Sequence, residues 1–131
     1  MYVDSNFLTN ENYKTSAGEI LKKNIMRKEY NKLVRDRIPE IIRRHGSECE
    51  FMEMSESEYH QALREKLLEE AQEAATAEPQ ELVTELADLY EVIDTIMNLC
   101  DIDRDLVLAE QEKRRIERGG FTRRIRLLWT Q

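Results

Sequence analysis

Apolar residues repeat at the spacing of an α-helix in two long stretches near the middle of the chain. The repeating positions are Leu63, Leu67, Ala71 and Ala74 in the first stretch, and Leu82, Leu86, Tyr90, Ile93 and Met97 in the second. At about 100° per residue, each set falls on one face of a helix. The pattern therefore predicts two amphipathic helices, starting near residues 55 and 80, with these faces turned toward the core.

Local signals mark where the two helices begin and where they separate. Ser55 and Glu58 have the spacing of a capping box, which satisfies free backbone N–H groups at a helix start. Pro79 interrupts the pattern, because proline is unfavourable inside a helix but suits its first turn. We expect the chain to reverse at Pro79, so that the helices pack antiparallel with their axes roughly 8–10 Å apart.

Weaker patterns precede this hairpin. A short helix is predicted with Pro39 in its first turn and Gly46 as its stop. The apolar face of this helix consists of Ile38, Ile41 and Ile42. The next residues alternate loosely between polar and apolar, which predicts a short strand over Glu48–Met54 with Phe51 and Cys49 turned inward.

After the hairpin, acidic residues from Asp101 to Asp103 end one helix and cap a third long helix over residues 104–118. Its expected inward residues are Leu106, Ala109 and Ile116. Gly119 and the glycine after it end this helix. Residues 121–129 alternate only in part and are a second candidate for a short strand.

These elements predict a mainly α protein, an antiparallel helical bundle with at most a small β element near the termini. Residues 30–131 have the length of one domain. Residues 1–29 are mostly polar and aperiodic, so we expect an N-terminal extension that is flexible or packs on a partner.

Charge is distributed unevenly along the chain. The formal net charge is −7 and 36% of the residues are charged, which argues against nucleic-acid binding driven by net charge. The middle of the chain is acidic, whereas residues 22–44 and 113–126 are rich in lysine and arginine. This distribution fits an anionic substrate that carries a metal ion. A helical protein with ordinary charged faces is the alternative.

The predicted hairpin would bring four carboxylates together. Glu73 and Glu85 each lie six residues from Pro79, and Glu70 and Asp88 each lie nine residues from it. If the chain reverses at the proline, each pair sits level across the two helices. Residues three apart also share a helix face, so all four acids would meet at one place.

Four neighbouring anions repel one another, and a divalent cation would relieve the repulsion. Carboxylate ligands favour hard cations such as Mg²⁺ or Mn²⁺. On the helical wheel, Glu70 and Glu85 border the apolar stripe without being fully buried, while Asp88 lies further from the core. Glu69 points further from the stripe and is a weaker candidate for a ligand. The alternative is a solvated acidic face, since glutamate is a good helix former.

Two basic clusters are candidates for binding phosphate oxygens, because arginine and lysine form charge-assisted bonds with them. Lys32 and Arg35 lie before the short helix, and Lys113, Arg118 and Arg123 surround the glycines that end the third long helix. The alternatives are a solvated surface and basic residues that stabilise a helix C-terminus.

Cysteine and hydropathy patterns limit the other possibilities. Cys49 and Cys100 lie far apart without a CxxC spacing, so both are expected to be core thiols rather than zinc ligands. No apolar run is long enough to span a membrane, and the N-terminus has no signal-peptide pattern, so a cytoplasmic location is expected.

Three sequence blocks together resemble a known family. The acidic block has the form EExxE, a gap, and then ExxD, with Glu69, Glu70, Glu73, Glu85 and Asp88 at the acidic positions. The blocks NKLVRDRIPEII before it and RGGFTRR after it look like one branch of the all-α nucleoside triphosphate pyrophosphohydrolases, the MazG-like and phosphoribosyl-ATP pyrophosphohydrolase-like group. The branch is described as predicted house-cleaning enzymes, and the resemblance covers residues 30–127.

The resemblance implies hydrolysis of a nucleoside triphosphate to the monophosphate and pyrophosphate with Mg²⁺, or Mn²⁺, as cofactor. The implied metal ligands are Glu70, Glu73, Glu85 and Asp88. Glu69 or Glu73 would orient or deprotonate the attacking water, and Lys32, Arg35, Lys113, Arg118 and Arg123 would neutralise the phosphates. A homo-oligomer, a dimer or a tetramer, is implied as well. Phosphoribosyl-ATP hydrolysis and a non-catalytic helical module are the alternatives.

Overall fold

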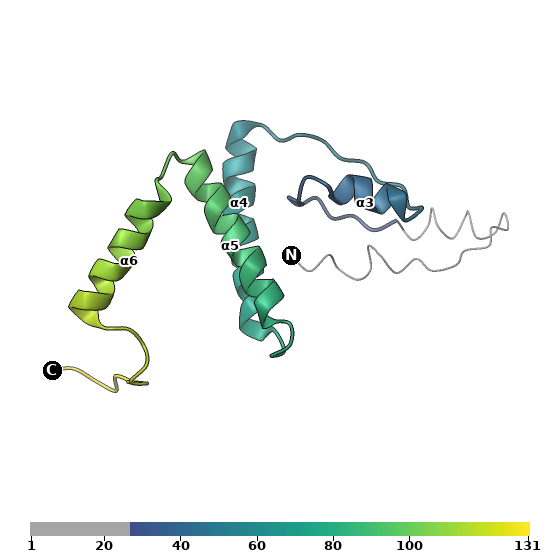
Figure 1. Ribbon diagram of the computed structural model, residues 1–131. Helices are drawn as coiled ribbons and strands as arrows, with labels where there is room; N and C mark the ends of the chain where they lie inside the picture. The colour runs from purple at the N-terminus through teal and green to yellow at the C-terminus, as the bar shows by residue number, and fades with distance from the viewer. Residues whose placement is uncertain (1–26) are drawn as a thin grey trace. The chain divides into compact units, whose positions relative to one another are not determined.

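The computed structural model describes residues 27–131, and this part of the chain is mainly α, as predicted. Its helices are α3 (Ile38–Arg44), α4 (Glu56–Thr76), α5 (Leu82–Leu99) and α6 (Arg104–Arg118) (Figure 1). The chain divides into two compact units, of which the first ends at Ile93 and the second spans Asp94–Gln131. The predicted boundary between an extension and one domain at residue 30 stays a prediction, and residues 1–26 lie outside the described part.

The predicted strands are absent from the described residues. Glu48–Met54 is irregular, and Phe51, which was expected to point inward, leaves 58% of its surface exposed. Residues 121–129 contain a turn followed by irregular chain. Both predictions are wrong, because loose alternation gives a strand only where a second strand satisfies its backbone N–H and C=O groups.

Helix α3 follows the predicted pattern. Pro39 lies in its first turn, and Gly46 has a φ of 84°, the left-handed backbone that favours glycine after a helix. Ile38 and Ile42 are buried, and Val34, Ile41 and half-buried Cys49 pack against them. The small apolar cluster fixes the segment just before α3, which carries two of the candidate phosphate-binding residues.

Helices α4 and α5 form the predicted antiparallel hairpin, side by side in Figure 1. The N-cap of the predicted capping box is confirmed, because the Ser55 Oγ atom accepts a hydrogen bond from the Glu58 backbone N–H at 3.2 Å, while the Ser55 hydroxyl donates to Glu58 Oε1 at 2.9 Å. Between the helices, the Glu81 N–H donates to the Glu78 carbonyl at 2.9 Å and closes a turn that contains Pro79. The chain reverses at the proline, and α5 begins two residues later than predicted, at Leu82.

The face that α5 buries differs in part from the predicted one: Met97 is buried as predicted and Ile93 is half-buried, but the first half of the stripe is not. Leu82, Leu86 and Tyr90 belong to the predicted inward stripe, yet they are exposed by 39%, 41% and 60%. The other buried residues of α5 are Glu85, Asp88 and Val92, at helical spacing i, i+3 and i+7. Helix α4 buries the same pattern, with Leu63, Lys66 and Glu70. The two helices therefore bury charged side chains together with a few apolar ones, and most apolar side chains in the first half of α5 are exposed.

Helix α6 buries none of its side chains, so the prediction that Leu106, Ala109 and Ile116 point inward is wrong. A common helix face does not by itself show that another element covers it. The predicted boundaries of α6 are confirmed: the Asp103 Oδ1 atom caps its start, and Gly119, with a φ of 81°, follows its last residue. Cys100 is exposed rather than a core thiol. No helix of the described residues is long and apolar enough to cross a membrane.

Candidate metal centre

The hairpin brings three of the four predicted metal ligands to one place. One carboxylate oxygen from each of Glu70, Glu85 and Asp88 lies within 4.8 Å of the other two. Glu70 comes from α4 and the other two from α5, as the equal distances from Pro79 predict. The arrangement follows from the antiparallel packing, because the levels of the two helices are fixed by the turn between them.

These carboxylates are more deeply buried than expected. Glu70 is fully buried, and Glu85 and Asp88 are exposed by only 3% and 6%. The prediction that Glu70 and Glu85 border the apolar stripe without being fully buried, with Asp88 further from the core, is therefore wrong. Burial strengthens the repulsion between neighbouring anions and removes the water that would solvate them. The cluster needs positive charge close by.

The fourth predicted ligand, Glu73, lies at the edge of this cluster and is half-buried. Burial raises the pKa of Glu73 to about 7, with further contributions from a hydrogen bond with Glu70 and from the negative charges of Glu70 and Glu85. Near neutral pH the Glu73 side chain is therefore protonated in part of the molecules and ionised in the rest. The raised pKa is a sign that the site holds more negative charge than its surroundings compensate.

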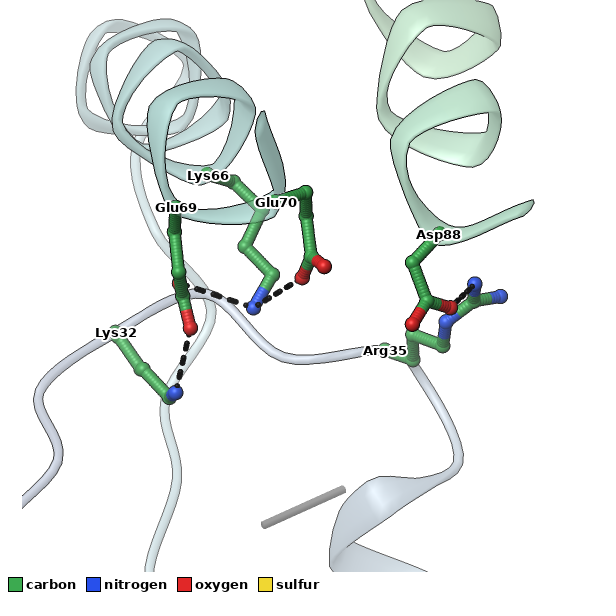
Figure 2. A network of polar contacts seen from close by, with 6 residues as sticks. All are labelled: Lys32, Arg35, Lys66, Glu69, Glu70 and Asp88. Atoms are coloured by element: carbon green, nitrogen blue, oxygen red, sulfur yellow. Dashed lines mark hydrogen bonds and ion pairs between the residues drawn. The ribbon is translucent and has the colours of Figure 1, made fainter. Parts of the chain in front are cut away.

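Lys66 supplies positive charge inside the hairpin. Its side chain is only 6% exposed, and its Nζ atom lies 3.2 Å from Glu69 Oε2 and 3.2 Å from Glu70 Oε1 (Figure 2). Lys66 is not among the site residues predicted from the sequence. The available signal was its spacing, because Lys66 precedes Glu69 by three residues and Glu70 by four, the distances at which helix side chains meet.

The segment before α3 adds two more positive side chains. The Lys32 Nζ atom donates to Glu69 Oε1 at 2.9 Å, and the Arg35 Nη2 atom donates to Asp88 Oδ1 at 2.7 Å (Figure 2). The structure thus places two of the five predicted phosphate-binding residues beside the carboxylates. The other three, Lys113, Arg118 and Arg123, are exposed residues of the unit Asp94–Gln131, and their role stays a prediction.

Glu69 and Glu73, the two candidate bases, have opposite electrostatic surroundings. Burial raises the pKa of Glu69, but the hydrogen bond from Lys32 and the positive charge of Lys66 outweigh it and hold this pKa below its ordinary value. Glu69 is therefore ionised and engaged with two lysines, whereas Glu73 titrates near neutrality. Of the two, Glu73 has the pKa that suits a general base.

The site has the composition and charge of a centre for one divalent cation. When Glu73 is ionised, five carboxylates, Glu69 included, face three positive side chains, and the two excess negative charges match one Mg²⁺ or Mn²⁺ ion. The Glu85 Oε2 atom is buried and has no hydrogen-bond partner among the described residues. Opposite ligands of a Mg²⁺ ion are about 4.2 Å apart, so the oxygens within 4.8 Å of each other need little movement. The residues present fit the cation.

An open groove adjoins the site on the side of Lys32. It has a volume of about 560 Å³ and runs along the first half of α4. Its walls include Asn31, Leu33, Met54, His60 and Gln61, as well as Lys32. The groove therefore offers apolar surface and amide groups next to Lys32, which also contacts Glu69.

Comparison with protein-family models, with curated proteins and with solved structures finds no match for this chain. The resemblance of its sequence blocks to the pyrophosphohydrolases therefore stays a prediction. The geometry of the carboxylates and of their positive neighbours is the independent observation on which a function can be argued.

Proposed function

We propose that this chain is a Mg²⁺-dependent nucleoside triphosphate pyrophosphohydrolase, which cleaves an ordinary or a damaged nucleoside triphosphate to the monophosphate and pyrophosphate. The observation that carries the proposal is the buried cluster of Glu70, Glu85 and Asp88. Among the described residues, Lys66 and Arg35 form ion pairs with two of its three carboxylates. A solvated acidic face, the alternative, would not bury three carboxylates between two helices.

Each part of the site has a task in this reaction. Glu70, Glu85 and Asp88 would hold the cation, which supplies positive charge against the triphosphate and makes a water molecule more acidic. The Glu73 carboxylate would accept the proton of the attacking water, because its pKa of about 7 leaves a part of it ionised and basic at neutral pH. Glu69 is held by Lys32 and Lys66 and is better placed to orient neighbouring groups.

Positive side chains at the rim would bind the substrate. Lys32 and Arg35 each contact one acid of the site and can turn to phosphate oxygens as negative charge builds on the leaving pyrophosphate. Because Lys32 stands between the carboxylates and the open groove, a triphosphate bound there would direct its nucleoside into the groove. Asn31 and Gln61 place amide groups where a base could be recognised.

A panel of nucleotides with detection of pyrophosphate tests the proposal. We expect pyrophosphate release that requires Mg²⁺ or Mn²⁺ and falls at least about a hundredfold in Glu70→Gln and in Asp88→Asn, because each removes a charged ligand. Glu78→Gln, in the exposed turn, makes the same change in charge and should keep full activity.

Each result of the panel has a distinct meaning. Release of inorganic phosphate without pyrophosphate, or full turnover by Glu70→Gln, contradicts the proposal. Preference for phosphoribosyl-ATP would keep the chemistry and change the substrate. Absence of hydrolysis, together with no effect of Mg²⁺ on the melting temperature, would indicate a non-catalytic module.

We also infer that the protein functions as a homo-oligomer. The outward face of α5 presents Leu82, Val83, Leu86 and Tyr90 next to one another, and each is at least 39% exposed. A second copy of the chain would cover these side chains and remove apolar surface from water. The oligomeric state that the sequence resemblance implies agrees with this exposed face.

A further inference from the structure

We propose that Lys66 is a resident counter-ion of the metal centre: its ammonium group neutralises Glu69 and Glu70 in the metal-free protein and leaves Glu70 when a divalent cation binds. The inference rests on the proposed function, since it assumes that the carboxylates bind a cation. It concerns a residue to which neither the sequence blocks nor the reaction assigns a role.

The burial of Lys66 is the first observation. Lysine is almost never fully buried unless it is paired, and Lys66 leaves only 6% of its side chain exposed. Its contacts are with two neighbouring carboxylates on its own helix, at 3.2 Å each. The lysine is therefore held in the hairpin by the same acids that would hold the cation.

The second observation is the position of Glu70 between the lysine and the rest of the cluster. Glu70 is fully buried, so its carboxylate has no water to exchange with, and one of its oxygens belongs to the set that includes Glu85 and Asp88. A divalent cation bound to this set would lie within a few ångströms of the ammonium of Lys66. Two positive groups at that distance repel strongly when little water lies between them.

The structure offers the lysine a way out of this conflict. Its Nζ atom also lies 3.2 Å from Glu69 Oε2, and Glu69 is only half-buried and is held from the other side by Lys32. The four-carbon stem of a lysine is flexible, so the ammonium can turn from Glu70 to Glu69 without leaving the helix surface. Glu69 thus serves as the alternative partner that keeps Lys66 paired in both states.

Arg35 differs from Lys66 in a way that sharpens the inference. It contacts Asp88 at 2.7 Å, but its side chain is 46% exposed, so water screens its charge. Lys66 is the positive group enclosed in the hairpin. Its charge should therefore control how tightly the site binds a cation, and its removal should have two opposite effects: a less stable metal-free protein and a tighter metal complex.

The experiment compares Lys66→Met with Arg64→Met, which removes one positive charge from an exposed position two residues away on the same helix. The dissociation constant for Mn²⁺ is measured by calorimetry, and melting temperatures are recorded in chelator and at saturating Mn²⁺. We expect Lys66→Met to melt lower in chelator and to bind Mn²⁺ about tenfold more tightly or better. Arg64→Met should stay within about twofold of the wild type, and Lys66→Arg, which keeps the charge, within about threefold.

Each outcome decides the matter. Equal or weaker Mn²⁺ binding by Lys66→Met overturns the role of Lys66 and leaves the metal site standing, whereas absence of Mn²⁺ binding by the wild type overturns the proposed function itself. If Lys66→Met folds only with Mn²⁺ present, the inference is supported, because the cation then replaces the missing charge. If it does not fold even at saturating Mn²⁺, the lysine does something that the cation cannot replace, and the inference fails.

Discussion

Replacement of Glu85 by glutamine should make the metal-free protein more stable. Glu85 is exposed by only 3%, its Oε2 atom has no hydrogen-bond partner among the described residues, and its carboxylate lies beside those of Glu70 and Asp88. Glutamine has nearly the same shape, removes the negative charge and adds an amide that can donate to the neighbouring carboxylates. Glu85→Gln would therefore reduce the repulsion among the three carboxylates, as a bound cation would in the wild type.

The size of the effect follows from the distances. Two unit charges 4.8 Å apart repel by about 3.5 kcal/mol at an effective dielectric constant of about 20, and Glu85 has two such neighbours. Lys66 and Arg35 offset much of this repulsion through Glu70 and Asp88. We expect a net gain in the free energy of unfolding of about 1–3 kcal/mol, which for a chain of this length raises the melting temperature by about 3–10 °C.

Melting curves in chelator and at saturating Mg²⁺ measure both halves of the prediction. The wild type should melt lower than Glu85→Gln in chelator and should gain stability from Mg²⁺, because a ligand that binds only the folded state stabilises it. Glu85→Gln should gain little or nothing from Mg²⁺. Glu78→Gln, in the exposed turn, removes the same charge and should match the wild type in both conditions.

Two results would refute the reasoning. If Glu85→Gln melts below the wild type in chelator, the carboxylates do not repel one another in the folded protein. If Glu85→Gln and the wild type gain equally from Mg²⁺, the cation binds somewhere else.

Three further predictions concern other parts of the site. The pKa of Glu73 is raised from 4.5 to about 7, so the folded state binds an extra proton between these two pH values. The free energy of unfolding of the metal-free protein should therefore fall by about 1–2 kcal/mol, after allowance for solvent screening, as the pH rises through this window. Chemical denaturation of the wild type and of Glu73→Gln across the window checks this, and an equal dependence of unfolding free energy on pH in the two proteins would contradict it. Arg35→Ala should lower kcat/KM about tenfold or more through lost phosphate contacts while leaving the Mn²⁺ dissociation constant within a few-fold, and the reverse pattern would assign Arg35 to the metal site rather than the substrate. Val83→Glu places a charge on the outward face of α5 and should shift the oligomer toward the monomer in sedimentation, and an unchanged sedimentation coefficient would show that another surface joins the subunits.

The hairpin and its carboxylates could be predicted from the sequence because short-range rules determine them. The capping box at Ser55 and the proline at position 79 are local signals, and equal residue counts from the turn place Glu70 level with Asp88 whatever else the fold does. The helix boundaries of α3 and α6 follow from Pro39, Gly46 and Gly119 in the same way.

The buried face of the hairpin could not be predicted in this way. Periodicity shows which residues share a helix face, but it does not show which face finds a partner. On α5 the rule that apolar residues lie inside selects Leu82 and Leu86, whereas the structure buries Glu85 and Asp88. Spacing on α4 places Lys66 beside Glu69 and Glu70, but only the structure shows that this lysine is buried with them.

The strand prediction failed for a related reason. The loose alternation of Glu48–Met54 says nothing about a neighbouring strand, and Phe51 stays on the surface with the Arg43 guanidinium 5.4 Å from its ring centre. A cation over an aromatic face stabilises the ring without burying it. The sequence pattern alone cannot distinguish this arrangement from an inward-facing strand residue.

The small number of buried apolar side chains has a calorimetric consequence. In the described part of the chain, the buried hydrophobic residues are Ile38, Ile42, Leu63, Val92 and Met97. Newly exposed hydrocarbon is what raises the heat capacity on unfolding and what sets the slope of stability against denaturant. The single chain should therefore show a small heat-capacity increment, a shallow urea transition and a flat dependence of stability on temperature, while its midpoint responds sharply to the divalent ions in the buffer.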